Sequence, residues 1–148
     1  IRSQHNIGSI FRTSDAFRIE ELYLCGITAT PPNREINKSA LGATESVKWQ
    51  YFEHTLQAIE KLRNDGYTIV AVEQASGSID LESYNHNPST KVALVFGNEV
   101  NGVSDDVMEE VDVCIEIPQF GTKHSFNVSV TAAIVMYQFF IKLKKKLL

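Results

Sequence analysis

Residues 117–140, IPQFGTKHSFNVSVTAAIVMYQFF, decide how this chain folds. The stretch leaves a short apolar strand, passes through a Gly-containing loop and reaches a polar cluster, Ser125-Phe126-Asn127, before a long apolar helix begins at about Val128. Backbone N–H groups at the start of a helix have no partner inside the helix and can hold a ligand. The sequence therefore predicts a binding site where this loop enters the helix.

The helix that follows is apolar on every side. Its apolar residues are Val128, Val130, Ala132, Ala133, Ile134, Val135, Met136, Phe139 and Phe140. A helix with this pattern is normally buried on every side. A chain of 148 residues can cover one side with its own sheet. We therefore expect a second copy of the chain to cover the other side, in a homodimer formed through this C-terminal helix.

Length and composition indicate one globular domain, because 148 residues with 43% apolar and 22% charged residues suffice for a core. The net charge of −4 argues against binding nucleic acid through overall charge, so an RNA contact requires a local basic patch. Cys25 and Cys114 each lie in an apolar run, as core cysteines of a reduced, cytoplasmic protein do. The sequence has no metal-binding spacing, and the last helix lacks the roughly 18 uninterrupted apolar residues of a membrane span.

Helical and strand patterns alternate along the chain. They predict helices at about residues 5–17, 54–64, 104–110 and from 128, a helical turn at 38–43, and strands at 21–27, 47–52, 67–72, 91–96 and 113–117. The polar stretches 28–37 and 75–89 are predicted to be loops. This order favours an α/β fold with a mostly parallel sheet and helices on both faces.

In such a fold, ligands bind where loops leave the carboxyl ends of the strands. These loops are predicted at residues 73–78, 97–102 and 118–126. None of them contains Gly-x-Gly-x-x-Gly or a Walker lysine, so a nucleotide held by its phosphates is not the favoured ligand. The same absence argues against a dinucleotide-dependent oxidoreductase.

Three polar clusters are candidates for the site, and each also has a purely structural explanation. Asn6 could cap the first helix, with Arg12 as a surface residue paired to Asp15. The stretch GNEVNG at 97–102 could be a simple turn, because Gly and Asn accept positive φ angles. The cluster at 125–127 could cap the long helix. Each cluster alone is therefore weak evidence for function.

Together the three clusters are more specific. Asn6 with Arg12, then FGNEVNG, then IP-x-x-G-x-x-x-S-x-N-V-S resemble the three signature motifs of the SPOUT class of methyltransferases, SpoU/TrmH branch. The motifs occur in family order and cover nearly the whole chain. Two positions depart from the family pattern: Gln119 stands where Met is frequent, and Phe126 stands where Leu is usual. Both changes affect the walls of the expected pocket and leave its polar groups in place.

The resemblance implies a fold and a cofactor. It implies that residues 1–148 form a single SPOUT methyltransferase domain with a C-terminal trefoil knot, a rare exception to the absence of knots in proteins. The family's first strand precedes the region of Asn6, so we expect that strand to lie upstream of this sequence. The implied cofactor is S-adenosylmethionine, without a metal, contacted at Gly97, Ile117 and Phe126. The family is dimeric, and the last helix lies in its interface.

The implied reaction is methyl transfer to a ribose 2′-hydroxyl of structured RNA, tRNA more than rRNA. In the family the equivalent of Arg12 is assigned to deprotonating this hydroxyl. Because arginine is hard to deprotonate, we favour Arg12 as the group that grips the target phosphate and polarises the hydroxyl. Asn6 would orient the ribose or Arg12, Ser125 and Asn127 would align the substrate and the loop, and Glu99 would fix the loop geometry.

Two other functions are compatible with the same motifs. One is a non-catalytic SPOUT-fold protein that binds RNA, although the complete polar set argues for an enzyme. The other is a SPOUT enzyme that methylates a base. The basic residues available for RNA are Arg2, Arg18, Arg34, Lys38, Lys123, Lys142, Lys144, Lys145 and Lys146. The lysines at the end could equally form a solvated helix terminus.

Overall fold

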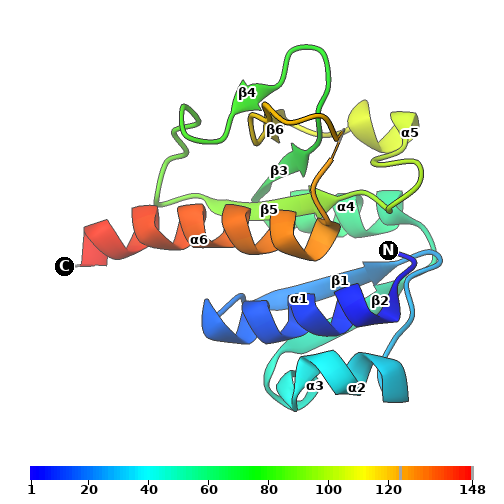
Figure 1. Cartoon of the computed structure of the whole chain (residues 1–148). Helices are drawn as coiled ribbons and strands as arrows, with labels where there is room; N and C mark the ends of the chain where they lie inside the picture. Colours follow the sequence, from blue (N-terminus) through cyan, green and yellow to red (C-terminus); the bar gives the residue numbers. More distant parts are fainter. Residues whose placement is uncertain (124, 148) are drawn as a thin grey trace. The chain divides into compact units, whose positions relative to one another are not determined.

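The structure is a computed structural model that describes residues 1–123 and 125–147, with no side chains described at 145–147. The chain forms two compact units, Ile1–Ala58 and Ile59–Leu148. The helices are α1 (Gln4–Ala16), α2 (Arg34–Ala40), α3 (Ala43–Ser46), α4 (Thr55–Asn64), α5 (Asp105–Met108) and α6 (Val128–Leu147). The strands are β1 (Glu21–Cys25), β2 (Lys48–Phe52), β3 (Tyr67–Val72), β4 (Ile79–Asp80), β5 (Lys91–Phe96) and β6 (Val113–Glu116) (Figure 1).

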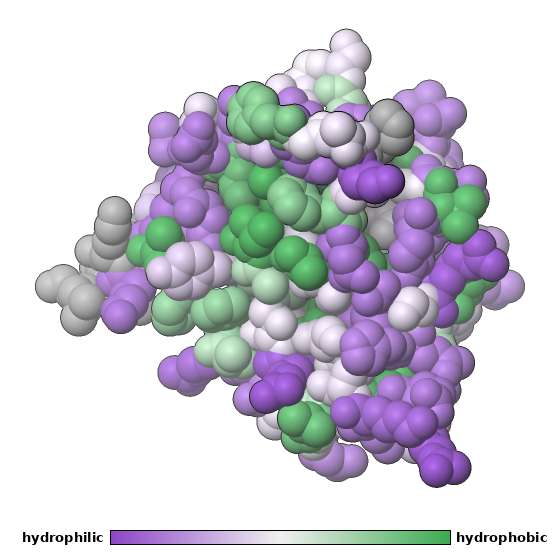
Figure 2. Space-filling model, in the orientation of Figure 1, coloured by the Kyte–Doolittle hydropathy of each residue, from purple (hydrophilic) through white to green (hydrophobic). Residues whose placement is uncertain are grey.

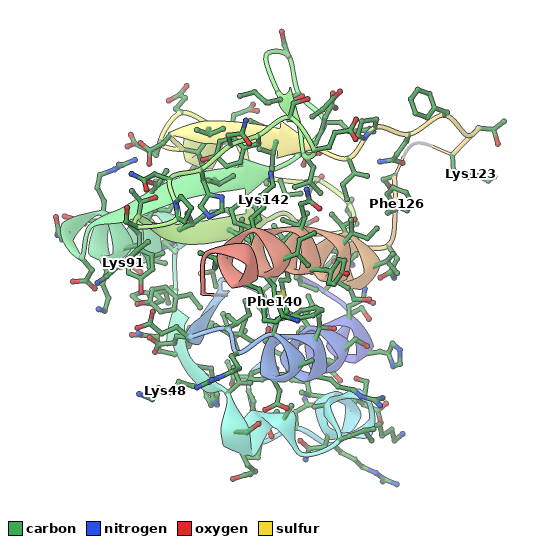
Figure 3. All side chains as sticks on the ribbon, turned by 90° about the vertical axis from the view of Figure 1, so that its left-hand side faces the viewer. Lys48, Lys91, Lys123, Phe126, Phe140 and Lys142 are labelled. Atoms are coloured by element: carbon green, nitrogen blue, oxygen red, sulfur yellow. The ribbon has the colours of Figure 1, made fainter. Side chains whose placement is uncertain are left out.

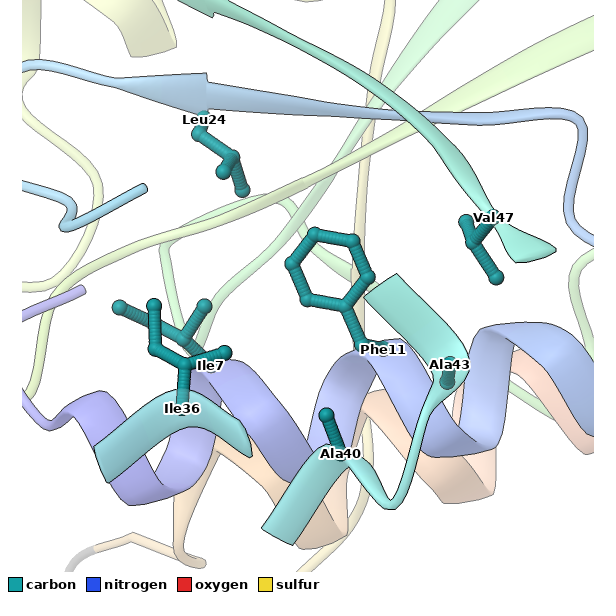
Figure 4. Packing of buried hydrophobic residues seen from close by; sticks show 7 residues of the cluster. All are labelled: Ile7, Phe11, Leu24, Ile36, Ala40, Ala43 and Val47. Carbon is teal, nitrogen blue, oxygen red and sulfur yellow. The ribbon is translucent and has the colours of Figure 1, made fainter. Parts of the chain in front are cut away.

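The first unit is built on a parallel pair of strands, β1 and β2. Its core joins α1, β1, α2 and α3 through Ile7, Phe11, Leu24, Ile36, Ala40, Ala43 and Val47 (Figure 4). Helices α1 and α2 approach closely at Gly8, where a Cβ atom would lie 2.3 Å from the carbonyl oxygen of Ile36. A side chain at position 8 would therefore force the two helices apart.

Two predictions for the first unit are wrong. Asn6 does not cap α1, because the helix begins at Gln4 and the hydroxyl of Ser3 accepts a hydrogen bond from the Asn6 N–H at 3.2 Å. The predicted loop at 28–37 ends early, because α2 begins at Arg34. Asn33 caps this helix, and its Oδ1 accepts hydrogen bonds from two N–H groups of the first turn, at 2.9 and 3.0 Å.

The second unit contains a four-stranded sheet in the order β4-β6-β3-β5, in which all pairs are parallel. Strand β4 lies inside the stretch 75–89 that was predicted to be loop. Its two residues are exposed and have no apolar pattern, so only pairing with β6 identifies them as a strand. The predicted α/β class with parallel pairing is confirmed, but the strands form two hydrogen-bonded sets where one sheet was expected.

Helices cover both faces of this second sheet. Side chains alternate between the two faces along each strand. The core on one face consists of Val70, Val72, Leu81, Ile115, Val135 and Phe139, so α6 covers that face. The core on the other face consists of Ile59, Ile69 and Val107, so α4 and α5 cover it. Burial of each Val or Ile side chain contributes about 1.5–3 kcal/mol, which fixes the strands beneath the site.

Helix α6 begins at Val128, as predicted, and the side chains described for it are buried along one side. Its buried residues are Ala132, Val135, Met136 and Phe139. Val130, Ile134 and Tyr137 are 47%, 37% and 53% exposed and follow a helical spacing of four and three residues. Figure 2 shows apolar surface around the middle of the face on which α6 is seen in Figure 1. No helix in the described part of the chain has the length and apolar character needed to span a membrane.

Candidate functional site

A cleft of about 770 Å³ opens at the carboxyl ends of β3, β5 and β6. Its walls come from the segments that follow these strands, at residues 72–75, 96–103 and 116–119, and from the start of α6 at 125–128. The three strands are parallel, so their carboxyl ends meet at one edge of the sheet. The cleft therefore lies at the edge that the sequence analysis predicted.

Six of the eight residues predicted for the site line this cleft: Gly97, Glu99, Ile117, Ser125, Phe126 and Asn127. Figure 3 shows Phe126 close to the start of α6 and Lys123 farther out on the same loop. The remaining two, Asn6 and Arg12, belong to the Ile1–Ala58 unit. Their approach to the cleft stays a prediction.

The 97–103 loop closes on itself. Asn98 and Gly102 form an antiparallel bridge, with N···O distances of 3.2 and 3.0 Å. The Asn98 Oδ1 accepts hydrogen bonds from the N–H groups of Val100 and Asn101 at 2.9 and 2.8 Å. Gly97 lies so close to the returning segment that a Cβ atom would be 2.0 Å from the carbonyl carbon of Gly102. Residues 97–102 therefore form a turn, as one of the two explanations offered by the sequence predicts. The same turn forms one wall of the cleft.

The start of α6 is organised by Asn127. Its Oδ1 accepts hydrogen bonds from the N–H of Ser129 at 2.9 Å, the N–H of Val130 at 3.3 Å and the hydroxyl of Ser129 at 2.6 Å. Asn127 thus caps the helix, which confirms the structural explanation for this member of the cluster. Ser125 is exposed at the cleft wall. His124, which sequence analysis leaves among the loop residues, lies outside the described residues.

The cleft is acidic. Glu73, Glu99, Asp105 and Glu116 are among its described lining residues, and no Lys or Arg is. A concave surface of this charge attracts cations and repels phosphates. The electrostatics therefore agree with the absence of a phosphate-binding motif in the sequence.

The ion pair of Arg12 with Asp15, which would have explained Arg12 as a purely structural residue, is not formed in the first unit. Asp15, its expected partner, accepts a hydrogen bond from the Ser46 hydroxyl at 2.6 Å. Among the described residues Arg12 forms no ion pair, and its side chain is exposed. Asn6, by contrast, is only 6% exposed. Arg12 is thus available for a contact outside its own helix.

Sequence analysis missed Glu73, which directly follows β3 and holds the 97–103 loop. Its Oε2 accepts a hydrogen bond from the Val103 N–H at 3.0 Å. An acidic residue directly after a buried strand, at the predicted ligand edge, is the signal that could have found it. Cys25 and Cys114 are free and half-buried, and burial raises the pKa of both thiols, as expected for core cysteines.

Comparison with known proteins identifies the family. Residues 1–137 match the model of the SpoU rRNA Methylase family. The chain is 34% identical over 142 residues to a tRNA (guanosine(18)-2′-O)-methyltransferase of Aquifex aeolicus, a match that covers 93% of this chain and 64% of the relative. It is 32% identical over 136 residues to the 23S rRNA (guanosine-2′-O-)-methyltransferase RlmB of Neisseria meningitidis, covering 92% of this chain and 53% of the relative.

A solved structure shows the same fold. An AdoMet-bound rRNA methyltransferase from Sinorhizobium meliloti superposes with a TM-score of 0.88 at 27% identity, covering 95% of this chain and 52% of that one. The chain spans 47% and 64% of the length of the first two curated relatives that it matches. Two of the three motifs line the cleft, and the third lies on α1. Together with the matches, this arrangement shows that the chain belongs to the SpoU rRNA Methylase family.

Proposed function

We propose that this protein transfers a methyl group from S-adenosylmethionine to a ribose 2′-hydroxyl of structured RNA. The observation that carries the proposal is the convergence of two family motifs, 97–102 and 117–129, on one acidic cleft at the carboxyl edge of a parallel sheet. The relatives named above are 2′-O-methyltransferases of tRNA and rRNA. We take tRNA as the first substrate to test, because the Aquifex relative has the higher identity of the two.

The cleft fits the proposed cofactor. S-adenosylmethionine supplies a methyl group on a positively charged sulfur and carries no phosphate. The carboxylates in the cleft wall suit a positive charge, and Ile117 and Phe126 supply apolar surface for an adenine ring. Gly97 exposes backbone at the wall without a side chain. Phosphate-bearing nucleotides would meet only repulsion from the charged groups of this lining.

The site residues divide into two proposed groups. Gly97, Ile117 and Phe126 contact the cofactor. Ser125 and Asn127 align the target nucleotide at the same cleft, and Asn127 also holds the start of α6. Glu99 fixes the geometry of the 97–102 loop. Asn6 and Arg12 complete the site from the opening helix. Arg12 would grip the target phosphate and polarise the 2′-hydroxyl, whose proton would pass to that phosphate. S-adenosylmethionine would supply the methyl group and leave as S-adenosylhomocysteine.

Further features of the family extend the proposal. We propose that residues 1–148 act as one methyltransferase domain and that its C-terminal part is knotted. A homodimer would cover the exposed apolar stripe of α6, which consists of Val130, Ile134 and Tyr137. In such a dimer the apolar residues on this side of the helix would be buried, as the sequence predicts for every side.

The test is an assay of methyl transfer to unmodified tRNA and rRNA transcripts, with mass spectrometry of the nucleosides and calorimetry of S-adenosylmethionine binding. We expect 2′-O-methylnucleosides with the wild type. Arg12→Ala should lower turnover at least a hundredfold and change cofactor affinity less than twofold. Lys48→Ala, which removes another exposed cation of the first unit, is the matched control and should stay active.

Three outcomes would count against the proposal. Turnover of Arg12→Ala within tenfold of the wild type, about 1.4 kcal/mol of barrier, would remove Arg12 from its role. Methylation of a base instead of a ribose would change the reaction. A folded wild-type protein that does not bind S-adenosylmethionine would contradict the proposed reaction and favour the alternative, a non-catalytic RNA-binding protein.

A further inference from the structure

We propose that Glu73 is a positioning residue that holds the 97–103 loop in the place beside the sheet that is required to bind the cofactor. The inference rests on the proposed function and adds a residue outside the three motifs. Glu73 is half-buried, directly follows β3 and lines the cleft. It therefore stands between the rigid sheet and the loop that carries Gly97.

The backbone of Glu73 is fixed to the sheet. Its N–H donates a hydrogen bond to the carbonyl of Ile115 at 3.0 Å, which extends the pairing of β3 with β6 by one residue. Its carbonyl accepts a hydrogen bond from the thiol of Cys114 at 3.3 Å. The side chain consequently projects from a base that the sheet defines.

The carboxylate uses both of its oxygens. Oε2 accepts from the N–H of Val103 at 3.0 Å, and Oε1 accepts from the N–H of Gln74 at 3.0 Å. Val103 is thirty residues away along the chain, on the returning limb of the loop. Hydrogen bonds to a charged acceptor contribute more than those to a neutral one. The bond to Val103 thus connects the loop with the end of β3.

The internal bonds of the loop fix its shape but not its place beside the sheet. The Asn98–Gly102 bridge and the Asn98 side chain join loop residues only to one another. Gly102 admits the carboxylate, because a Cβ atom there would lie 2.3 Å from the Glu73 Oε2. Gly97 in turn packs on the peptide between Gly102 and Val103, at a hypothetical Cβ distance of 2.2 Å from the Val103 nitrogen. A shift of Val103 would therefore move Gly97.

Three substitutions separate positioning from a direct effect of charge. Glu73→Gln keeps the length of the side chain but offers one acceptor instead of two. Glu73→Asp keeps the charge but is one methylene shorter and cannot reach both N–H groups. Glu73→Ala removes both properties. Glu82→Ala, which removes an exposed carboxylate of the same unit outside the cleft lining, is the matched control.

The measurements are calorimetric affinity for S-adenosylmethionine, the separate KM values for cofactor and RNA, and urea unfolding. We expect affinity to fall about threefold in Glu73→Gln and at least tenfold in Glu73→Asp and Glu73→Ala. The KM for RNA and the affinity of Glu82→Ala should change less than twofold. If charge attraction were the cause, Glu73→Asp would bind like the wild type and Glu73→Gln like Glu73→Ala, which would overturn the inference.

Failure of this inference can be told apart from failure of the proposed function. If the wild type does not bind the cofactor, both the proposed function and the role of Glu73 are refuted. A wild type that binds, with variants that bind within twofold of it, removes the role of Glu73 alone. If the Asp and Ala variants do not fold, Glu73→Gln decides together with amide exchange at Val103, measured without cofactor. Faster exchange with weaker affinity supports positioning, and any other combination refutes it.

Discussion

Asn127 should have two separable roles, one in stability and one in turnover. Its Oδ1 accepts hydrogen bonds from two N–H groups in the first turn of α6, at 2.9 and 3.3 Å. Replacing an N-cap by Ala typically costs about 1 kcal/mol. The added bond from the Ser129 hydroxyl is exposed and contributes little. Asn127→Ala should therefore lower the free energy of unfolding by about 1 kcal/mol, or the Tm by about 3–4 °C.

Asn127→Asp distinguishes the two roles. A carboxylate accepts the same hydrogen bonds and interacts favourably with the N-terminal end of the helix, by about 0.3–1 kcal/mol. The Asp variant should therefore unfold at or above the wild-type midpoint. It lacks the amide donor, so methyl transfer should still fall at least tenfold if Asn127 aligns the substrate. Urea unfolding and the methyl-transfer assay measure the two effects on the same preparations.

The matched control is Ser125→Ala, at an exposed neighbour that contributes no cap to α6. Its unfolding midpoint should equal that of the wild type. Equal midpoints for Asn127→Ala and the wild type would refute the capping argument. Full activity of Asn127→Asp would show that the residue acts on the helix alone.

Two further predictions concern stability. Arg18 has a φ of 53° just after α1, a conformation that costs non-glycine residues about 1 kcal/mol. Arg18→Gly should therefore raise the free energy of unfolding, measured in urea, by about 1 kcal/mol. The control Arg18→Ala removes the charge but keeps a side chain, so it should not raise the free energy of unfolding. Burial and then the nearby Lys142 ammonium lower the pKa of His86 below its ordinary 6.5, so the folded state favours the neutral ring. The stability that the neutral ring contributes should be complete above about pH 6.5 and should fall as the pH drops through the lowered pKa. In urea unfolding at several pH values, the free energy of unfolding should depend less on pH in His86→Gln than in the wild type. The same pH dependence in both proteins would exclude His86 as the cause.

The packing around His86 explains why this group titrates abnormally. Its ring lies 4.7 Å from the ring of Phe139, and its Nδ1 is buried without a hydrogen-bond partner among the described residues. Lys142 donates a hydrogen bond to the carbonyl of Tyr84 at 2.5 Å, and its positive charge acts on the His86 ring. Protonation would bury a second charge beside the first, and α6 and the 81–90 segment would separate more easily.

The position of the cleft could be predicted from the sequence because it follows from local patterns. The runs that became β3 and β5 are continuous and apolar, and their predicted bounds are those observed. Parallel pairing then brings the following loops to one edge. Periodicity and the parallel arrangement were enough to bring the 97–102 and 118–126 loops to one edge, whereas the choice of Gly97 and Ile117 came from the family resemblance.

Other features depend on contacts between distant residues and were missed for that reason. Asn6 resembles a cap in sequence, but Ser3 caps the helix and the packing of the first unit buries Asn6. Strand β4 exists only through its pairing with β6. Glu73 looks like any acidic residue after a strand until its bond to Val103 is seen. The assignments of β4 and Glu73 each need a partner that is far away in the sequence.

The acidic cleft constrains how an RNA can be held. An RNA substrate brings phosphates to a wall with four carboxylates and no Lys or Arg among its described residues. Repulsion of that kind weakens binding unless a cation lies between the phosphate and the wall. The cation must come from outside the lining, and within the motifs of this chain Arg12 is the candidate. A guanidinium would neutralise a phosphate with paired hydrogen bonds. The charge of the cleft therefore supports the proposal that Arg12 anchors a phosphate, because the described lining supplies no cation for that purpose.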